Sequence, residues 1–283
     1  MWSAVHRKGA TLNNPQLGSS DWDHSSHQEF FDYYAQESQS PETLQRLRSV
    51  RDTVLRVSES RAGQLEVADI GCGAGTQCLL WAELNHRVHG LDVNEPLVQL
   101  AQKRAEGAGF VIDFQVGSAV DLPWPDASMD VSLALELLEH VAEWDKCLAE
   151  CTRILRPGGI LVLTTTNFLC PIQQEFRLPL YSWYPRPLKR HFESLAKTSR
   201  PALANFAKYP AVNWFSFYSL RKVLAKEGFR CLDRFDVLDV TKKSRIARSI
   251  ASSIRHVSLL RWVAHVCTPG TMVFAVKEDS ASG

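Results

Sequence analysis

The stretch Val67-Ala68-Asp69-Ile70-Gly71-Cys72-Gly73-Ala74-Gly75 decides how this chain is expected to fold. An apolar run ends in an acidic residue and opens into three glycines at alternate positions, and a helix is expected from Thr76. Glycines let a backbone turn sharply and let a ligand lie against bare main chain, because no Cβ stands in the way. A strand, a glycine turn and a helix in this order are the nucleotide-binding arrangement of doubly wound sheets.

The spacing of the glycines indicates the kind of ligand. A dinucleotide-binding loop reads G-x-G-x-x-G and presents a helix N-terminus to a pyrophosphate. This loop reads G-x-G-x-G and follows Asp69, which suits a ligand without phosphates. A second acid, Asp92, ends the next apolar run, about twenty residues downstream, where a carboxylate can accept hydrogen bonds from both ribose hydroxyls. The alternative for Asp92 is a helix N-cap.

Strand and helix patterns alternate along the middle of the chain, which predicts a mainly parallel sheet with right-handed crossovers. The expected strands are 65–70, 88–91, 111–116, 129–134 and 160–166. Helices are expected from Pro41 to about Ser58, from Thr76, from Glu95 or Pro96, and from about Trp144 to Leu155. A helix at 219–227, a strand in 229–240 and a last strand at 271–276 follow.

Taken in order, these motifs resemble the class I S-adenosylmethionine-dependent methyltransferases. The resemblance is close from Leu65 to Thr166 and looser elsewhere, and it also includes Gly117-Ser118-Ala119, Asp121-Leu122-Pro123 and Arg156-Pro157-Gly158-Gly159. It implies a doubly wound α/β fold, Rossmann-like, with a mainly parallel seven-stranded sheet and helical insertions. The implied cofactor is S-adenosyl-L-methionine. A redox or nucleotide-binding fold with coincidental glycines is the alternative.

The resemblance also implies a set of cofactor-binding residues, of which the glycines would pass under the methionine and ribose parts. Asp92 would accept the ribose hydroxyls, and Asp69 would either order the loop or reach the cofactor's amino group. Many relatives carry an acid where this chain has Ser118, so the adenine contact there is expected to be weaker or to come from backbone. The full set is Asp69, Gly71, Gly73, Gly75, Asp92, Val93, Ser118, Ala119 and Leu135.

The segment Leu135-Glu136-Leu137-Leu138-Glu139-His140-Val141 follows the fourth expected strand and contains an E-x-x-E-H pattern. On a turn or helix, the first and last of these residues share one face. Two carboxylates and an imidazole could hold a divalent cation such as magnesium, or act as acid and base. The pattern looks like that of ubiquinone-biosynthesis O-methyltransferases, where a metal site is implied. We expect His140, supported by Glu136, to be the catalytic base; the alternative is that Glu139 and His140 only orient the loop.

Four parts are expected along the chain: an N-terminal arm and helical cap (1–60), a cofactor-binding core (61–167), a substrate-side insertion (168–218), and the C-terminal part of the core (219–283). The arm carries an aromatic run at 30–34. The insertion could line an apolar pocket, or it could pack its own small core. The candidate pocket residues are Trp183, Tyr184, Trp214, Phe215 and Phe217, and the basic cluster from Arg186 to His191 could receive an anionic group or be solvated.

The segment 242–265 predicts a basic amphipathic helix inserted between the last two strands. Ile246, Ile250, Ile254 and Val257 fall on one stripe, with Arg248 and Arg255 opposite. Such a helix can lie on an anionic membrane. The alternative is a helix docked on the domain or on a partner chain.

Composition agrees with an α/β enzyme and argues against some partners. The chain has 283 residues, 45% of them hydrophobic, and a net charge of +1, so no global field favours nucleic acid. Seven scattered cysteines suggest reduced thiols and a cytoplasmic location, and packing is favoured over zinc for Cys147 and Cys151. No run is apolar enough to span a membrane, and the N-terminus has no signal-peptide pattern.

The function expected from the sequence is methyl transfer to a small molecule, on an oxygen of a hydroxylated aromatic, quinone-precursor or lipid-like acceptor. Methylation of nitrogen or carbon on a sugar or natural product stays open. A binding module that keeps the cofactor fold as a scaffold is the non-enzymatic alternative. No Asn-Pro-Pro-Tyr motif, typical of nucleobase amino methylation, follows the fourth expected strand.

Overall fold

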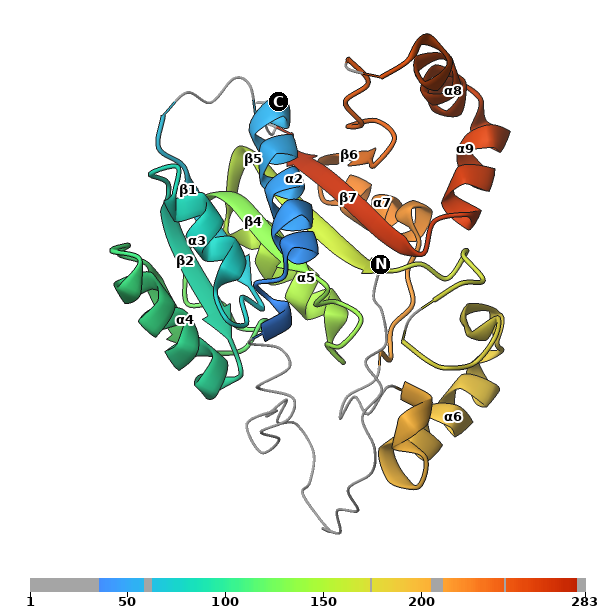
Figure 1. Ribbon diagram of the computed structural model, residues 1–283, viewed down its shortest axis with the longest axis horizontal. Helices are drawn as coiled ribbons and strands as arrows, with labels where there is room; N and C mark the ends of the chain where they lie inside the picture. Colours follow the sequence, from blue (N-terminus) through green and yellow to red (C-terminus); the bar gives the residue numbers. More distant parts are fainter. Residues whose placement is uncertain (1–35, 59–62, 174, 205–210, 242, 279–283) are drawn as a thin grey trace.

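A seven-stranded sheet with helices on both faces organises the molecule (Figure 1). The computed structural model describes residues 36–58, 63–173, 175–204, 211–241 and 243–278. The strand order is β3-β2-β1-β4-β5-β7-β6, and β7 runs antiparallel to both of its neighbours. The strands are β1 Glu66–Ile70, β2 Arg87–Asp92, β3 Asp113–Val116, β4 Met129–Leu135, β5 Leu155–Thr166, β6 Phe229–Asp233 and β7 Gly270–Lys277. The predicted doubly wound, mainly parallel sheet is confirmed.

The helices fill the crossovers and the two insertions. They are α2 Pro41–Val57, α3 Thr76–Ala82, α4 Glu95–Gly107, α5 Trp144–Arg153, α6 Arg186–Thr198, α7 Phe217–Lys226, α8 Arg245–His256 and α9 Ser258–Val266, with short 3₁₀ turns at Tyr181–Trp183 and Pro201–Ala204. Local signals explain several starts, since Ser40 and Asn94 cap α2 and α4 with their side chains. The predicted N-terminal arm and its aromatic run at 30–34 lie outside the described residues.

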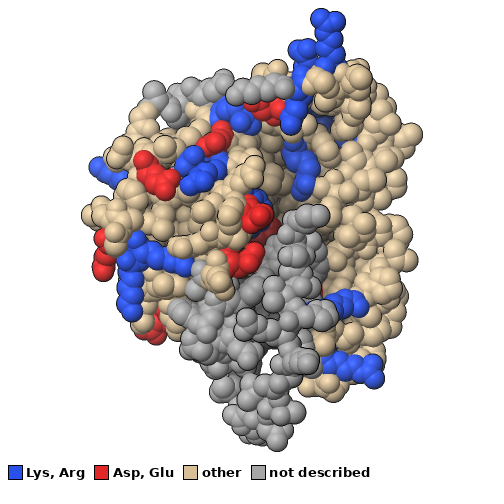
Figure 2. Space-filling model, viewed as in Figure 1, with Lys and Arg blue, Asp and Glu red and all other residues tan. Residues whose placement is uncertain are grey.

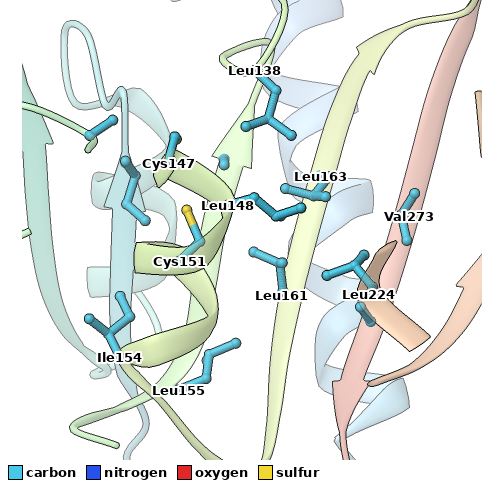
Figure 3. Packing of buried hydrophobic residues seen from close by; sticks show 14 of the residues in the cluster. Leu138, Cys147, Leu148, Cys151, Ile154, Leu155, Leu161, Leu163, Leu224 and Val273 are labelled. Atoms are coloured by element: carbon cyan, nitrogen blue, oxygen red, sulfur yellow. The ribbon is translucent and has the colours of Figure 1, made fainter. Parts of the chain in front are cut away.

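Alternate residues of each strand face opposite sides of the sheet, so each strand contributes side chains to two hydrophobic cores, one on each face. In β1, Val67 packs with the helices α2, α3 and α4, whereas Ala68 and Ile70 pack with α5 and α7. Figure 3 shows the second core, where Leu148 and Cys151 of α5 meet Leu161 and Leu163 of β5. The two cores hold the strands rigidly and leave the strand ends for ligand binding.

Both cysteines of α5 are buried in this second core as free thiols. The packing role predicted for Cys147 and Cys151 is therefore confirmed. All seven cysteines are free, as the scattered spacing predicted.

Some predicted boundaries were wrong. The strand predicted within 229–240 ends at Asp233, whose carboxylate accepts the backbone N–H groups of Phe235 and Asp236 at 2.8 and 3.0 Å and turns the chain. The single helix predicted at 242–265 is two helices, because Val257 adopts an extended conformation (φ −107°, ψ 108°). β5 begins at Leu155, earlier than predicted.

The order of the strands reverses between β1 and β4, which pair in parallel near the middle of the sheet. Open α/β sheets bind ligands beyond the carboxyl ends of the strands at such a switch point. The glycine loop follows β1, Asp92 ends β2, and the Glu136–His140 segment follows β4. The topology thus brings three segments that are far apart in sequence to one edge.

Candidate functional site

The glycine loop is a tight left-handed turn held against the end of β2. Gly71, Gly73 and Gly75 have φ of 76°, 51° and 75°, a region that L side chains rarely adopt. The backbone N–H groups of Gly71 and Cys72 both donate to the Leu91 carbonyl, at 2.7 and 3.0 Å. A Cβ at Gly75 would lie 2.7 Å from the Cβ of Ala101, so only glycine fits at that position.

Asp92 connects the glycine loop to the next crossover. One carboxylate oxygen accepts the Gly73 N–H at 2.8 Å, and the other accepts the Asn94 N–H at 2.8 Å. Burial raises the pKa of Asp92, and the backbone donors counteract that shift. The N-cap alternative is wrong, because Asn94 caps α4 by accepting the N–H of Leu97. Each carboxylate oxygen has a further lone pair, which leaves Asp92 able to accept hydroxyls beside the glycine turn.

Asp69 is buried behind the loop. Its carboxylate accepts a hydrogen bond from the Cys78 thiol of α3 at 3.2 Å, and the side chain is 3% exposed. Burial raises its pKa from 3.8 to about 7, and the nearby charge of Asp92 adds to the increase. This environment agrees with the loop-ordering role that was one of the two expectations for Asp69.

The first turn of α3 holds polar groups that the sequence reading missed. Thr76 and Gln77 are 8% and 4% exposed. Within the described residues, the Thr76 hydroxyl and both polar atoms of the Gln77 amide have no hydrogen-bond partner. Buried polar atoms are normally paired, so these groups are suited to a ligand beside the loop. A hydroxyl and an amide offer donors and acceptors on the helix side of the turn, and Asp92 offers acceptors on the β2 side.

The remaining predicted cofactor residues lie around the same edge. Val93, directly after Asp92, is 38% exposed, and Leu135 at the end of β4 is partly buried. Ser118 is exposed, and its hydroxyl accepts the Val120 N–H at a long 3.4 Å. Ala119 is 7% exposed and packs in the hydrophobic core, so its side chain supports the loop after β3.

The E-x-x-E-H segment is a turn in which the two glutamates lie in different surroundings. Glu136 has φ of 54°, its side chain is about half exposed, and it pairs with Arg46 of α2 at 3.5 Å. Glu139 is 1% exposed and accepts the Thr165 hydroxyl at 2.8 Å. Burial raises the pKa of Glu139 well above its usual value, and the charge of Glu136 adds to this. The hydrogen bond from the Thr165 hydroxyl ties Glu139, and with it the turn, to β5.

The half-buried His140 follows in the same turn, where its backbone N–H donates to the Leu137 carbonyl at 3.0 Å. Among the described residues, no three His, Cys, Asp or Glu side chains are grouped so that they could hold a metal ion. The turn therefore does not support the predicted divalent-metal site at Glu136, Glu139 and His140. The physical reason is that Glu136 faces solvent and Arg46, while Glu139 faces Thr165.

Asn213, which sequence reasoning missed, clamps this turn from a distant part of the chain. Its side-chain amide donates to the Leu138 and Val141 carbonyls at 3.0 and 2.7 Å. The backbone N–H groups of Val212 and Asn213 donate to the Glu139 carbonyl at 2.9 and 3.1 Å. A single asparagine before α7 carries no recognisable pattern, so no sequence signal could have found it.

The substrate-side segment agrees with the alternative in which it packs its own small core. Phe176 stacks on Tyr181 with ring centroids 4.1 Å apart, and Tyr184 and Trp214 pack against this cluster. Phe215 and Phe217 belong to the main core, which agrees with a packing role for these two residues.

The basic cluster of this segment is split between surface and interior. Lys189 is 8% exposed, donates to the Ser182 carbonyl at 2.9 Å and lies 4.3 Å from the centroid of the Trp214 ring. Burial lowers its pKa from 10.5 to about 8. Arg186, Arg190 and His191 are exposed, which agrees with the solvated alternative. Lys189 is not part of a surface that could receive an anionic group.

The segment that contains the glycine loop, Asp92 and the turn after β4 is similar to known proteins. Residues 68–163 match the family model described as a methyltransferase domain. A ubiquinone biosynthesis O-methyltransferase of Maricaulis maris is 35% identical over 166 residues, covering 55% of this chain and 64% of that protein. One of Mesorhizobium japonicum is 37% identical over 103 residues, 36% of this chain and 41% of that protein. The chain thus spans less than two thirds of the length of these curated relatives.

Solved structures share the fold at low identity. The magnesium protoporphyrin IX methyltransferase of Synechocystis with bound SAH has a TM-score of 0.53 and 16% identity, covering 89% of this chain and 95% of that one. A putative sarcosine dimethylglycine methyltransferase of Galdieria sulphuraria has a TM-score of 0.53 and 18% identity, covering 89% and 92%. Both likenesses show that the shared fold extends over most of the chain and is not confined to the glycine loop.

Proposed function

We propose that this chain, whose residues 68–163 match the model of a methyltransferase domain, transfers a methyl group from S-adenosylmethionine to a small molecule. The acceptor atom is an oxygen of a hydroxylated aromatic, quinone-precursor or lipid-like compound. The relatives named ubiquinone biosynthesis O-methyltransferase support this acceptor class. Methylation of nitrogen or carbon on a sugar or natural product is the second candidate within the enzyme class.

The observation that carries the proposal is the hydrogen bond between Asp92 and the Gly73 N–H at 2.8 Å. It places a carboxylate beside a left-handed glycine turn at the switch point of the sheet. A ribose with two hydroxyls meets its acceptor there, and a thioether or sulfonium chain can pass over the bare main chain. Thr76 and Gln77 supply unpaired polar atoms on the helix side of the turn.

The chemistry required of the protein is alignment and removal of one proton. The cofactor, when bound, supplies an electrophilic methyl group. A phenolic oxygen attacks well once it has lost its proton, so a base next to the acceptor accelerates the reaction. We assign the base to His140, at the mouth of β4, with Glu136 at its side. Glu139 keeps the turn in place through Thr165, and its burial favours the protonated form of the carboxyl, so we do not assign the base to it.

Calorimetry with S-adenosylmethionine and S-adenosylhomocysteine tests the cofactor assignment. Gly73→Val puts a side chain where the ligand lies, and Asp92→Ala removes the ribose acceptor. Each change is expected to weaken binding at least ten-fold. The matched controls are Gly107→Val, at an open position of α4, and Asp121→Ala, at an exposed carboxylate. Binding within two-fold of the parent chain in both site variants contradicts the assignment.

Turnover requires a separate measurement. The parent chain, His140→Ala and Glu136→Gln are incubated with labelled cofactor and phenolic, catecholic, quinol and sugar acceptors, and the products are identified by mass spectrometry. An O-methylated phenol or quinol that His140→Ala no longer forms supports the proposal. Cofactor binding without turnover on any acceptor favours the non-catalytic binding module.

A further inference from the structure

The helices α8 and α9 form an arm outside the sheet. Figure 1 places them beyond β6 and β7, at the edge of the molecule. Their buried residues are Ala251 in α8 and His265 in α9. Isoleucines that pack against the domain were the expected alternative to membrane contact, and the structure contradicts that packing for Ile246 and Ile250, which are 74% and 56% exposed.

Polar contacts fix the arm to the domain instead. Arg255 donates to the Phe235 and Leu238 carbonyls, each at 2.7 Å, so it faces the domain and not the solvent. Arg261 donates to the buried Asp233 carboxylate at 2.8 Å, and His265 lies 2.8 Å from the same carboxylate. These hydrogen bonds hold the inward side of the arm against the domain. They fix the orientation of the arm, so that its apolar side faces outward.

The outward side is unusually apolar for a surface. In α9, Leu259 and Val263 lie one turn apart, on the side away from Arg261 and His265. Exposed side chains of this kind continue along both helices: Ile246, Ile250, Val257, Leu259, Leu260, Trp262 and Val263. Scattered apolar residues are normal on a surface, but a concentration of them on two consecutive helices indicates an interaction site.

The charge of the segment that carries this apolar side has one sign. No Asp or Glu occurs between Asp239 and Glu278. Lys243, Arg245 and Arg248 are exposed at the start of α8. In Figure 2, basic side chains project from the upper end of the region where Figure 1 places α8, and the right-hand edge below them is free of acidic side chains among the residues drawn in colour. A second copy would meet this side with the same positive charge, whereas a surface of acidic headgroups complements it.

We propose that α8 and α9 dock the protein on an anionic lipid bilayer. The apolar side chains enter the interface between headgroups and acyl chains, and Lys243, Arg245 and Arg248 pair with acidic headgroups. Amphipathic helices with a basic flank bind membranes through these two contributions together. Neither the fold nor the cofactor site requires an exposed apolar arm, so the inference is independent of the proposed function.

The position of the arm connects the membrane to the candidate site. β7 begins at Gly270, which pairs with Thr166 at the carboxyl end of β5. The Asn167 side chain, next in sequence, donates to the carbonyls of His265 and Thr268 at 2.9 and 2.7 Å. The end of α9 is thus tied to the edge where the acceptor would bind. Docking through the arm would bring that edge near the bilayer and its dissolved compounds.

Vesicle flotation with the full chain tests the proposal. The vesicles are phosphatidylcholine alone, or phosphatidylcholine with phosphatidylglycerol at 7:3, each at low and high salt. Binding is expected only with the anionic lipid, and it should weaken as salt rises. One basic residue near such a surface contributes about five-fold to binding, so Arg245→Glu with Arg248→Glu should lower it about twenty-fold or more.

Matched variants separate docking from general effects. Lys103→Glu with Lys222→Glu makes the same change of net charge at exposed positions of α4 and α7. Val111→Ser removes an apolar side chain that is 101% exposed, as a control for Ile246→Ser with Ile250→Ser. Calorimetry with S-adenosylmethionine verifies that each variant is folded, and unchanged cofactor affinity keeps this test distinct from that of the proposed function.

The outcomes are decisive. Loss of anionic-vesicle binding in the arm variants, with binding retained in their controls, supports the proposal. Absence of flotation at low salt overturns it, and so does an equal loss in arm and control variants. A concentration-dependent dimer that Ile246→Ser with Ile250→Ser dissociates also overturns it, because a second copy then covers the apolar side.

Discussion

Asp69 should make the stability of the apo protein depend on pH, and Asp69→Asn should remove that dependence. Asp69 is 3% exposed, and its carboxylate accepts a hydrogen bond from the Cys78 thiol at 3.2 Å. Burial raises its pKa from 3.8 to about 7. The folded state therefore holds a proton that the unfolded state has released, and stability falls as pH rises through this window.

The magnitude follows from the size of the shift. About three pKa units at about 1.4 kcal/mol each correspond to roughly 4 kcal/mol, an order-of-magnitude figure. This cost is absent below pH 4, grows between pH 4 and pH 7, and is constant above it. Asparagine has the same shape and no charge, and its amide oxygen can still accept the Cys78 thiol. Asp69→Asn should therefore leave the free energy of unfolding nearly unchanged at pH 4 and raise it by a few kcal/mol at pH 8.

The assay is urea unfolding of the apo protein at intervals from pH 4 to pH 8, followed by circular dichroism. Asp121→Asn, at an exposed carboxylate, is the control and should follow the parent chain. A difference between Asp69→Asn and the parent that is the same at pH 5 and pH 8 refutes the reasoning. Calorimetry then separates the two roles expected for Asp69: loop support leaves cofactor affinity within about two-fold, whereas contact with the cofactor's amino group lowers it more.

Three further changes test other parts of the site. Gly75→Ala should lower the free energy of unfolding by about 2 to 5 kcal/mol, measured with urea, because its φ of 75° and a Cβ 2.7 Å from that of Ala101 both oppose a side chain. Asn213→Ala should cost about 2 kcal/mol by losing two hydrogen bonds, and should lower turnover more than cofactor affinity, in parallel calorimetric and kinetic assays. Glu139→Gln should keep the Thr165 hydrogen bond. Its melting temperature should exceed that of the parent chain by more at pH 8 than at pH 5, because burial raises the pKa of the parent carboxyl and ionising it at high pH costs stability.

Each of these has an outcome that contradicts it. Gly109→Ala has the same φ of 75° with no atom within 4 Å of its Cβ, so it isolates the backbone strain. If Gly75→Ala costs no more than Gly109→Ala, the steric argument is wrong. Asn213→Ala with unchanged turnover shows that the turn after β4 keeps its shape without the clamp. If Glu139→Gln melts below the parent chain and the difference is largest at pH 8, the raised pKa of the parent carboxyl is contradicted.

Much of the fold was predictable because its signals are local. The start of α3 at Thr76 follows from the glycine turn, and the strand assignments follow from apolar runs with polar ends. The placement of Gly73 and Asp92 at one edge of the sheet was predictable for the same reason, since Asp92 ends a strand pattern and Gly73 follows one. The polar atoms of Gln77 were missed, because one glutamine in a helix carries no pattern and only its burial without a partner singles it out.

By itself, the sequence determined the order of strand, left-handed glycine turn and helix. It also determined that the next strand ends in an acidic residue, Asp92. Backbone conformation and the spacing of neighbours settle those features within a few residues. Only the tertiary structure decided that Glu139 points at Thr165 while Glu136 pairs with Arg46. It likewise decided that Lys189 is buried and Ile246 is exposed. Each of these depends on contacts between segments far apart in the chain, and the spacing of residues carries no information about such contacts.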